Sequence, residues 1–239
     1  TIAAASVQFQ ELSHATAAVQ IILQLGIPLA RIELLDALQM KACIAYSKLS
    51  DYSERASLFL EFHGSPASVA DQVAQVEAIV REFEALPFRW ATATEDRTAL
   101  WTARHNGYWA ARALAPGKES FATDACVPIS RLADCIDACQ ALAQDSGLLT
   151  PIVGHVGDGN LHFNLSAQPG DTSLASRGAE IRRVIHDLVA ERGGSFSAEH
   201  GIGQTKVDEL ARYAPAVELE IMHGIKHLLD PNGIMNPGK

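Results

Sequence analysis

Hydrophobic and polar positions along the chain recur with a period of two residues in some segments and near 3.6 residues in others, which predicts a mixed α+β fold. Segments of period two, expected as strands, cover residues 3–9, 30–34, 57–63, 88–94, 121–128, 152–156, 161–165 and 195–198. Segments of helical period cover residues 11–25, a short stretch ending near residue 46, and residues 65–86, 95–114, 130–147, 173–192 and 207–229.

The order of these elements indicates an internal duplication. Residues of about 1–94 and 120–200 each have the pattern of a βαββαβ unit, and helix 95–114 joins them. Two such units predict an α+β fold of duplicated ferredoxin-like antiparallel sheets, with helices packed on one face and further helices at the C-terminus. We expect residues 1–239 to act as one domain built from these two halves.

Composition narrows the class of protein. The 239 residues are 48% hydrophobic and 20% charged, which is typical of a folded globular chain and excludes a disordered one. The net charge is −9 and cations form no block, so we expect no nucleic-acid partner. The longest apolar runs, such as 21–25, are far shorter than the roughly 20 residues that span a bilayer, so no transmembrane segment is expected.

The sequence GHVGDGNLH at 154–162 is the sharpest chemical signal in the chain. Its turn residues predict a hairpin with Gly157–Asn160 as the loop, which places His155 opposite His162 on one face. Two imidazoles side by side on a rigid scaffold favour a metal site over a structural histidine pair, because neutral imidazole is a common metal ligand.

A third ligand is expected from SAEHGIG at 197–203, at the end of the last predicted strand. Glu199 would complete a His/His/Glu set with an open position for a substrate oxygen. His200 would then lie beside the metal, free to act as a general base near neutral pH. Taken alone, an acid and a histidine in a turn are common, so this prediction depends on proximity to the hairpin.

Helix 95–114 carries two stripes of larger side chains. Arg104, Tyr108 and Arg112 share one face, and an aromatic stripe with Trp109 forms the next, which we interpret as core packing. Arg104 is either a solvated helix charge, which spacing alone slightly favours, or a clamp for a substrate carboxylate. Cys135 and Cys139 lie four residues apart on a predicted helix and are interpreted as buried apolar residues rather than a redox pair.

Several motifs together resemble the C-terminal domain of FAD-linked oxidases in the vanillyl-alcohol-oxidase superfamily, and within it the group of D-lactate dehydrogenases and the FAD-linked subunit of glycolate oxidase. The matching stretches are GIPLARIELLDALQMKA (26–42), LFLEFHGS (58–65), LWTARHNGYWAARAL (100–114), TDACVPISRL (123–132), GHVGDGNLHFNL (154–165), SAEHGIGQTK (197–206) and LLDPNGIMNPGK (228–239). They cover almost the whole chain.

The resemblance implies a flavin-dependent oxidation in which a divalent metal, zinc or manganese, holds a small 2-hydroxyacid beside FAD. The residues matched to roles in that family are His155, His162 and Glu199 as metal ligands, His200 as the base, Arg104 and Asn164 at the substrate, and Asn236 and Lys239 near the cofactor. The family's N-terminal FAD-binding domain is absent from this chain, so the chain alone is expected to bind no flavin and to turn over no substrate.

The expected activity is oxidation of D-lactate or a similar D-2-hydroxyacid to the 2-oxoacid, with hydride passing to FAD. Relatives acting on D-2-hydroxyglutarate carry a lysine just before the position of Asp124, and no cation stands at 120–124 here, although Arg112 could substitute. Glycolate, D-2-hydroxyglutarate and a non-catalytic, metal-bearing scaffold module remain alternatives. A cytoplasmic location, peripheral to the inner membrane or mitochondrial in a eukaryote, is expected; the electron acceptor and a homo-oligomeric state stay open.

Overall fold

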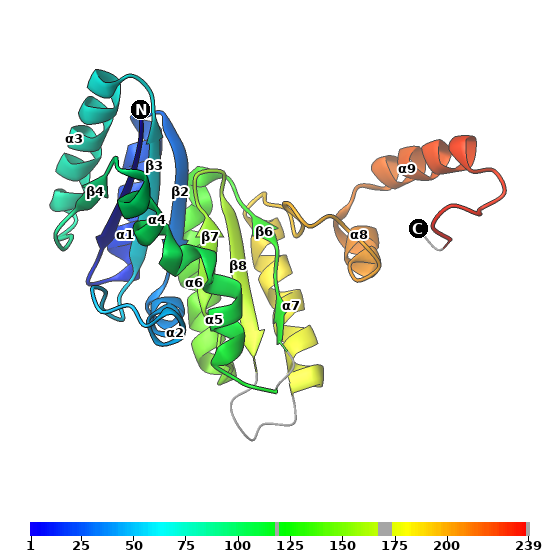
Figure 1. Ribbon diagram of the computed structural model, residues 1–239. Coiled ribbons are helices and arrows are strands. Elements are labelled where there is room, and N and C mark those ends of the chain that lie inside the picture. The colour runs from blue at the N-terminus through cyan, green and yellow to red at the C-terminus, as the bar shows by residue number, and fades with distance from the viewer. Residues whose placement is uncertain (118–119, 167–173, 238–239) are drawn as a thin grey trace.

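A computed structural model describes residues 1–117, 120–166 and 174–237. The first half contains β1 (Ile2–Gln8), α1 (Leu12–Gln24), β2 (Leu29–Leu35), α2 (Ala37–Ser47), β3 (Ser57–His63), α3 (Pro66–Glu82) and β4 (Arg89–Ala91) (Figure 1). Next come α4 (Thr94–His105), α5 (Gly107–Ala113), β5 (Ser120–Ala122), β6 (Ala125–Cys126), the 3-10 turn η1 (Ile129–Arg131), α6 (Leu132–Ser146), β7 (Ile152–His155) and β8 (Asn160–Ser166). The chain ends with α7 (Leu174–Glu191), α8 (Val207–Tyr213) and α9 (Ala216–Leu229). Ser173, the predicted start of α7, lies outside the described residues.

The strands form one sheet, with the order β4-β1-β3-β2-β7-β8-β5 and with β6 pairing β8. Every paired neighbour is antiparallel. The two predicted halves meet where β2 pairs β7, with Leu34 opposite Gly154 and Leu35 opposite Val153. The predicted α+β antiparallel fold is therefore confirmed, with the two sets of strands joined edge to edge into a shared sheet.

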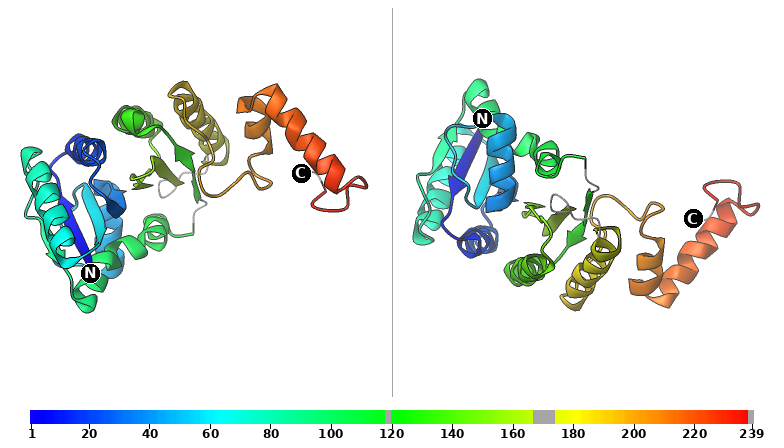
Figure 2. Two further views of the ribbon diagram at one scale, coloured as in Figure 1. Left: turned by 90° about the horizontal axis from the view of Figure 1, so that it is seen from above. Right: turned by 90° about the horizontal axis from the view of Figure 1, so that it is seen from below.

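Helices cover both faces of this sheet (Figure 2). The larger core lies under α1, α3, α6 and α7, where residues such as Phe62 and Phe163 are fully buried. A second, smaller cluster on the opposite face brings Leu35, Phe59 and Trp101 together under α2, α4 and α5. The expectation of helices on one face therefore holds for the larger core only. Side chains on both faces of β1, β2 and β3 are apolar, so helices cover both faces of these strands.

Local sequence explains where several helices begin. Ser65 accepts a hydrogen bond from the backbone N–H of Ser68 and precedes Pro66, as predicted for the start of α3. Asp36 caps α2 through Gln39 N–H, and the same carboxylate oxygen accepts the N–H of Ile152. This buried cap ties α2 to the first residue of β7, and burial raises the pKa of Asp36 to about 7.

Helix 95–114 was predicted to be continuous, and this prediction is wrong. The chain breaks at Asn106, so α4 and α5 are separate helices. Because of this break, the aromatic side chains no longer share one helix face. Trp101 is buried and stacks on His105, whereas Trp109 on α5 is 58% exposed and does not pack in the core.

Two further expectations near the C-terminus need correction. Residues 195–198 form a single bridge between Ser195 and Cys126 and no strand, because the next amides turn toward a buried aspartate described below. The tail predicted as one helix over 207–229 divides into α8 and α9 at Ala214 and Pro215. Ala214 is extended because the residue before a proline is disfavoured in helical conformation.

The C-terminal helices project beyond the sheet (Figures 1 and 2). Helix α8 contacts α7 through Asp187, whose carboxylate accepts hydrogen bonds from Arg212 and Tyr213. Helix α9 buries none of its side chains, and its large apolar residues are exposed. These are Val217, Ile221, Met222, Ile225, Leu228 and Leu229. Among the described residues, no helix is long and apolar enough to cross a membrane.

Candidate active site

The hairpin of β7 and β8 presents two histidines on one face. His155 pairs with Asn160 and Val153 pairs with His162, so the loop is 156–159. The predicted register, with the histidines directly opposed, is therefore wrong by two residues. An even shift keeps side chains on the same face, so the two rings still lie near each other diagonally, with centroids 5.6 Å apart.

The register shift follows from the contact between the hairpin loop and an adjacent backbone segment of the same chain. Gly159 has a φ of +80°, and its carbonyl accepts the N–H of Val127 at 3.0 Å. A Cβ on Gly159 would lie only 2.0 Å from the carbonyl oxygen of Val127. Because the turn is drawn tightly against this backbone, Asn160 belongs to the strand and not to the loop.

Both histidines are oriented by hydrogen bonds at Nδ1. His162 Nδ1 donates to the carbonyl oxygen of Thr123 at 3.1 Å, and His155 Nδ1 donates to Glu33 Oε1 at 2.7 Å. Since an oxygen acceptor requires the proton on Nδ1, each neutral ring carries its free lone pair on Nε2. A hydrogen-bonded outer nitrogen is the usual arrangement of histidines that bind a metal.

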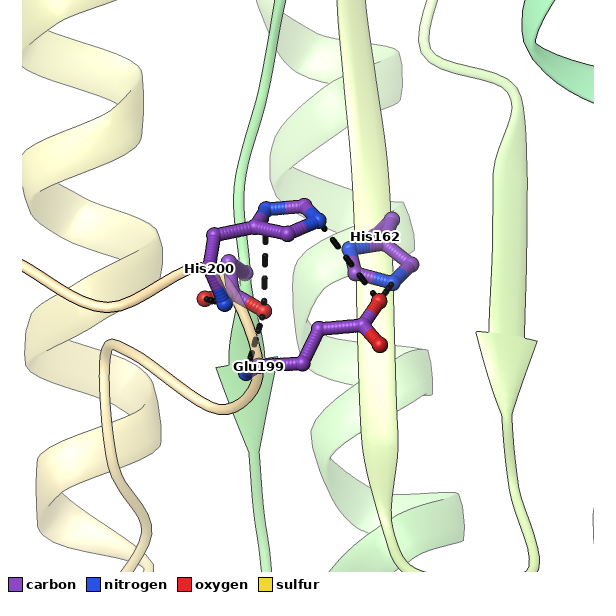
Figure 3. A group of neighbouring side chains, drawn as sticks. His162, Glu199 and His200 are labelled. Atoms are coloured by element: carbon purple, nitrogen blue, oxygen red, sulfur yellow. Dashed lines mark hydrogen bonds and ion pairs between the residues drawn. The ribbon is translucent and has the colours of Figure 1, made fainter.

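Glu199 faces these two free nitrogens. Its Oε1 lies 3.4 Å from His155 Nε2 and 3.1 Å from His162 Nε2 (Figure 3 shows His162 and Glu199). Donor atoms that share one ion at about 2.1 Å are separated by about 3.0–3.4 Å across octahedral or tetrahedral angles. Glu199 Oε1 thus lies within or close to this range from the free nitrogens of both histidines, although His155 is not part of the group of possible ligands that all lie within 4.8 Å of one another.

Asp124 is a second acidic group, close to this set. Its ligand atoms lie within 4.8 Å of those of His162, Glu199 and His200. Asp124 is 1% exposed and its oxygens already accept the backbone N–H groups of Ala198, Glu199 and His200 and the ammonium of Lys206 at 2.9 Å. With its lone pairs engaged, Asp124 holds the loop in place and is poorly suited to bind a metal.

The pKa values of these groups reflect burial and charge pairing. Burial opposes ionisation of Asp124, but hydrogen bonds from Lys206 and the loop amides outweigh it and hold the pKa of Asp124 well below its usual range. The hydrogen bond to Glu33 raises the pKa of His155, whereas burial lowers the pKa of His162. Burial of Glu33 is outweighed by His155 and Arg104, so the pKa of Glu33 is lowered.

His200 lies on the open side of the predicted ligand set. Its ring stacks on that of His162, with centroids 5.2 Å apart and an angle of 19° between planes (Figure 3). The side chain is 56% exposed, and its Nε2 lies 3.5 Å from Glu199 Oε1. A histidine at this position can exchange a proton with a molecule bound in front of the ligands.

Arg104 reaches the same region from α4. Its Nε donates to Glu33 Oε2 at 2.9 Å, and its side chain is 20% exposed. The interpretation of Arg104 as a solvated charge is therefore wrong. In the part of the chain that the structure describes, its two terminal nitrogens make no further hydrogen bond. Arg104, His155 and Glu199 all line one cleft of about 1060 Å³.

The remaining predicted site residues lie farther out. Asn164 follows His162 by two residues on β8 and lines a cavity of about 70 Å³ with Tyr108 and Arg112 of α5. Asn236 is exposed in the segment after α9, which lies beyond β7 and β8 and away from the hairpin (Figure 1). Lys239 lies outside the described residues.

Sequence reasoning missed three charged residues of this site. Glu33, Asp124 and Lys206 make buried or half-buried ion pairs with or beside the predicted ligands. Each stands in a stretch that resembles the oxidase family, so the motifs contained them without indicating their partners. The signal available was an acid at an alternate position of an apolar strand, as with Glu33 between Ile32 and Leu34.

Comparison with known proteins identifies the family of this chain. The model of a family described as FAD linked oxidases, C-terminal domain, matches residues 1–239. The chain belongs to this family. Among similar FAD-linked oxidase relatives, the probable mitochondrial D-lactate dehydrogenase of Danio rerio is 42% identical over 91% of the chain and 44% of the relative. The glycolate oxidase subunit GlcD of Escherichia coli K12 is 28% identical over 97% of the chain and 46% of the relative.

A solved structure supports the fold. The 4-ethylphenol oxidase of Gulosibacter chungangensis superposes over 100% of this chain and 53% of its own, with a TM-score of 0.74 and 17% sequence identity. Identity at this level indicates the shared fold and no more. The oxidase C-terminal domain described here spans less than half the length of the curated relatives it matches.

Proposed function

We propose that this chain is the substrate- and metal-binding part of an FAD-dependent D-2-hydroxyacid dehydrogenase that oxidises a D-lactate-like substrate to the 2-oxoacid. The observation that carries the proposal is the convergence of His155 Nε2 and His162 Nε2 on Glu199, together with the cleft that His155 and Glu199 line with Arg104. A set of neutral nitrogen and carboxylate donors beside a partly buried guanidinium suits an anionic substrate with an oxygen to coordinate. The D-lactate dehydrogenase relative supports the same substrate class.

In this proposal His155, His162 and Glu199 hold a divalent ion, zinc or manganese. Arg104 binds the substrate carboxylate through its two terminal nitrogens, because its Nε is already occupied by Glu33. His200 accepts the proton of the 2-hydroxyl on the open side of the ligand set. When bound, the ion supplies Lewis acidity at the hydroxyl and FAD supplies the hydride acceptor.

We place the FAD-binding domain outside this chain, on its N-terminal side. Helix α9 supports contact with a second domain, because its six large apolar side chains named above are exposed. Covering them against a second domain would bring the segment with Asn236 and Lys239 toward a cofactor bound there. This chain alone is then expected to lack turnover. The D-lactate dehydrogenase relative is named as mitochondrial, so we propose a mitochondrial location for a eukaryotic source.

The proposed substrate has one carboxylate. Residues Ser120–Ala122 of β5 offer no cation, and Arg112 is the one cation among the described residues that line the small cavity at Asn164. Arg112 is exposed and its Nη1 donates to the Tyr108 hydroxyl at 3.3 Å. A second carboxylate at this small cavity would therefore be left poorly paired, at a cost in free energy.

Steady-state kinetics of the full-length enzyme test this substrate preference. The kcat/KM for D-lactate and D-2-hydroxybutyrate should exceed that for D-2-hydroxyglutarate by about tenfold or more, a difference of ~1.4 kcal/mol in transition-state binding. Glycolate, which lacks the methyl group, should fall between them. A tenfold preference for D-2-hydroxyglutarate would contradict the proposed preference for a monocarboxylate.

Metal content and turnover of full-length variants test the assigned roles. Glu199→Gln should lose the metal, because a neutral amide replaces the anionic donor. His200→Gln should retain the metal and lower kcat by about 100-fold or more. His63→Gln, at an exposed histidine that contacts Glu61, is the matched control and should change neither. The reverse pattern would exchange the two roles, and absence of flavin reduction by any 2-hydroxyacid in the metal-loaded enzyme would favour the scaffold module.

A further inference from the structure

We propose that Glu33 is a positioning residue that couples the metal ligand His155 to the carboxylate-binding Arg104, an inference that rests on the proposed function. Glu33 is 4% exposed, and each of its two carboxylate oxygens has its own partner. Oε1 accepts from His155 Nδ1 at 2.7 Å, and Oε2 accepts from Arg104 Nε at 2.9 Å. The Glu33 side chain thus orients both the proposed metal ligand His155 and the proposed carboxylate-binding residue Arg104.

The sheet places Glu33 between its partners. Strand β2 pairs β7 with Leu34 opposite Gly154, and continuing this register by one residue brings Glu33 opposite His155. On the same face, α4 packs against α2, and Arg104 lies near its last turn. The three charged groups therefore come from β2, β7 and α4, which are parts of the fold far apart in sequence.

Each hydrogen bond leaves the functional atoms of its partner free. With Nδ1 donating to Glu33, His155 presents Nε2 toward Glu199. With Nε donating to Glu33, the planar guanidinium of Arg104 is fixed and its two terminal nitrogens remain available for a substrate carboxylate. A buried carboxylate alone would be costly, and the permanent charge of Arg104 compensates it.

A glutamine at this position has the same size but cannot serve both partners. Its single oxygen can face only one of the two donors, while its NH₂ group donates and would face the other, either His155 Nδ1–H or Arg104 Nε–H. An aspartate keeps the charge but is one methylene shorter, so it reaches one partner at most. The two substitutions therefore separate loss of charge from loss of reach.

The test uses the full-length enzyme and two readouts, the dissociation constant for zinc or manganese and the KM for D-lactate. Glu33→Gln should weaken metal binding by about 10–100-fold, the range found for outer-shell partners of metal-binding histidines, and should raise KM by a similar factor. Glu61→Gln on the adjacent strand β3 is the matched control. Glu61 also contacts a histidine, His63 at 2.8 Å, and its loss should change neither readout.

A second variant shows whether the effect on KM passes through Arg104. Arg104→Met should raise KM and leave the metal dissociation constant within about twofold of wild type. Adding Glu33→Gln to Arg104→Met should then weaken metal binding but raise KM no further. If the single Glu33→Gln variant does not fold, Glu33→Asp replaces it, with smaller shifts of both readouts expected.

Three outcomes would overturn the inference. In the first, either Glu33 variant keeps both the metal dissociation constant and the KM within twofold of wild type. In the second, one of these two constants changes while the other stays. In the third, the effects of Glu33→Gln and Arg104→Met on KM multiply in the double variant. A failure of the proposed function is distinguishable, because the wild-type enzyme would then bind no metal or reduce no flavin with D-lactate.

Discussion

The hairpin of β7 and β8 and the loop of residues 197–206 hold the two sides of the candidate site by different physical means. The hairpin positions His155 and His162 by strand register, with many backbone hydrogen bonds sharing the constraint. The loop has no strand of its own and positions Glu199 through one buried aspartate, Asp124, with Lys206. Many hydrogen bonds therefore share the task of holding the backbone of the two histidines, whereas the backbone of the carboxylate ligand depends on one ion pair.

Removing the carboxylate of Asp124 should produce the largest effect. Asp124→Ala leaves Lys206 without its partner and the amides of Ala198, Glu199 and His200 unsatisfied, so we expect a loss of about 3–5 kcal/mol in unfolding free energy, together with loss of metal binding. Asp158→Ala, at an exposed aspartate in the hairpin turn, is the control and should cost little. Urea unfolding measures both; equal stability of the two variants would refute this account of the loop.

Acid should destabilise the packing of α7, the helix that precedes the loop. His186 on α7 is buried beside Phe196 and Tyr213, and burial lowers its pKa to about 4. Because the unfolded chain takes up this proton near pH 6.5, stability falls as pH drops from about 6.5 toward 4, by up to about 3 kcal/mol. His186→Phe should remove this slope between pH 7 and 4.5 in urea unfolding. An unchanged slope would assign it to other groups.

The hairpin should be sensitive to added volume at its turn. Gly159→Ala combines a positive φ with a Cβ that would meet the Val127 carbonyl, so we expect a loss of about 2–3 kcal/mol. Gly26→Ala is the matched control: its φ is +68° but nothing lies within 4 Å of its Cβ, and about 1 kcal/mol is expected. Thermal unfolding compares them, and similar losses would mean that the turn is not tightly packed.

The smallest effect is expected at the exposed contact between α8 and α7. Arg212→Met removes an ion pair with Asp187 that is open to solvent, and we expect a change below about 1 kcal/mol that shrinks further in salt. Unfolding at low and high ionic strength measures this. A loss as large as that of Asp124→Ala would show that α8, rather than Asp124, holds the loop.

The sequence pattern was sufficient for the strands and helices of the first half and for the hairpin, because their period and turn residues are local. The prediction that His155 and His162 lie on one face is correct despite the error in register, because side chains alternate with a period of two. Asp124, Lys206 and Glu33 could not be assigned partners, since their contacts join segments 71 to 122 residues apart. The break at Pro215 was readable from the proline, and the break at Asn106 falls at an Asn-Gly dipeptide, which is also a local signal for a turn.

Anomalous X-ray diffraction from crystals of the full-length enzyme, recorded at the absorption edges of zinc and manganese, would show whether His155, His162 and Glu199 hold the metal. We expect one anomalous peak within about 2.0–2.3 Å of His155 Nε2, His162 Nε2 and a Glu199 oxygen, with Asp124 still bound to Lys206. A peak coordinated by Asp124 and His200 without His155, or no peak in enzyme that reduces its flavin with D-lactate, would contradict it.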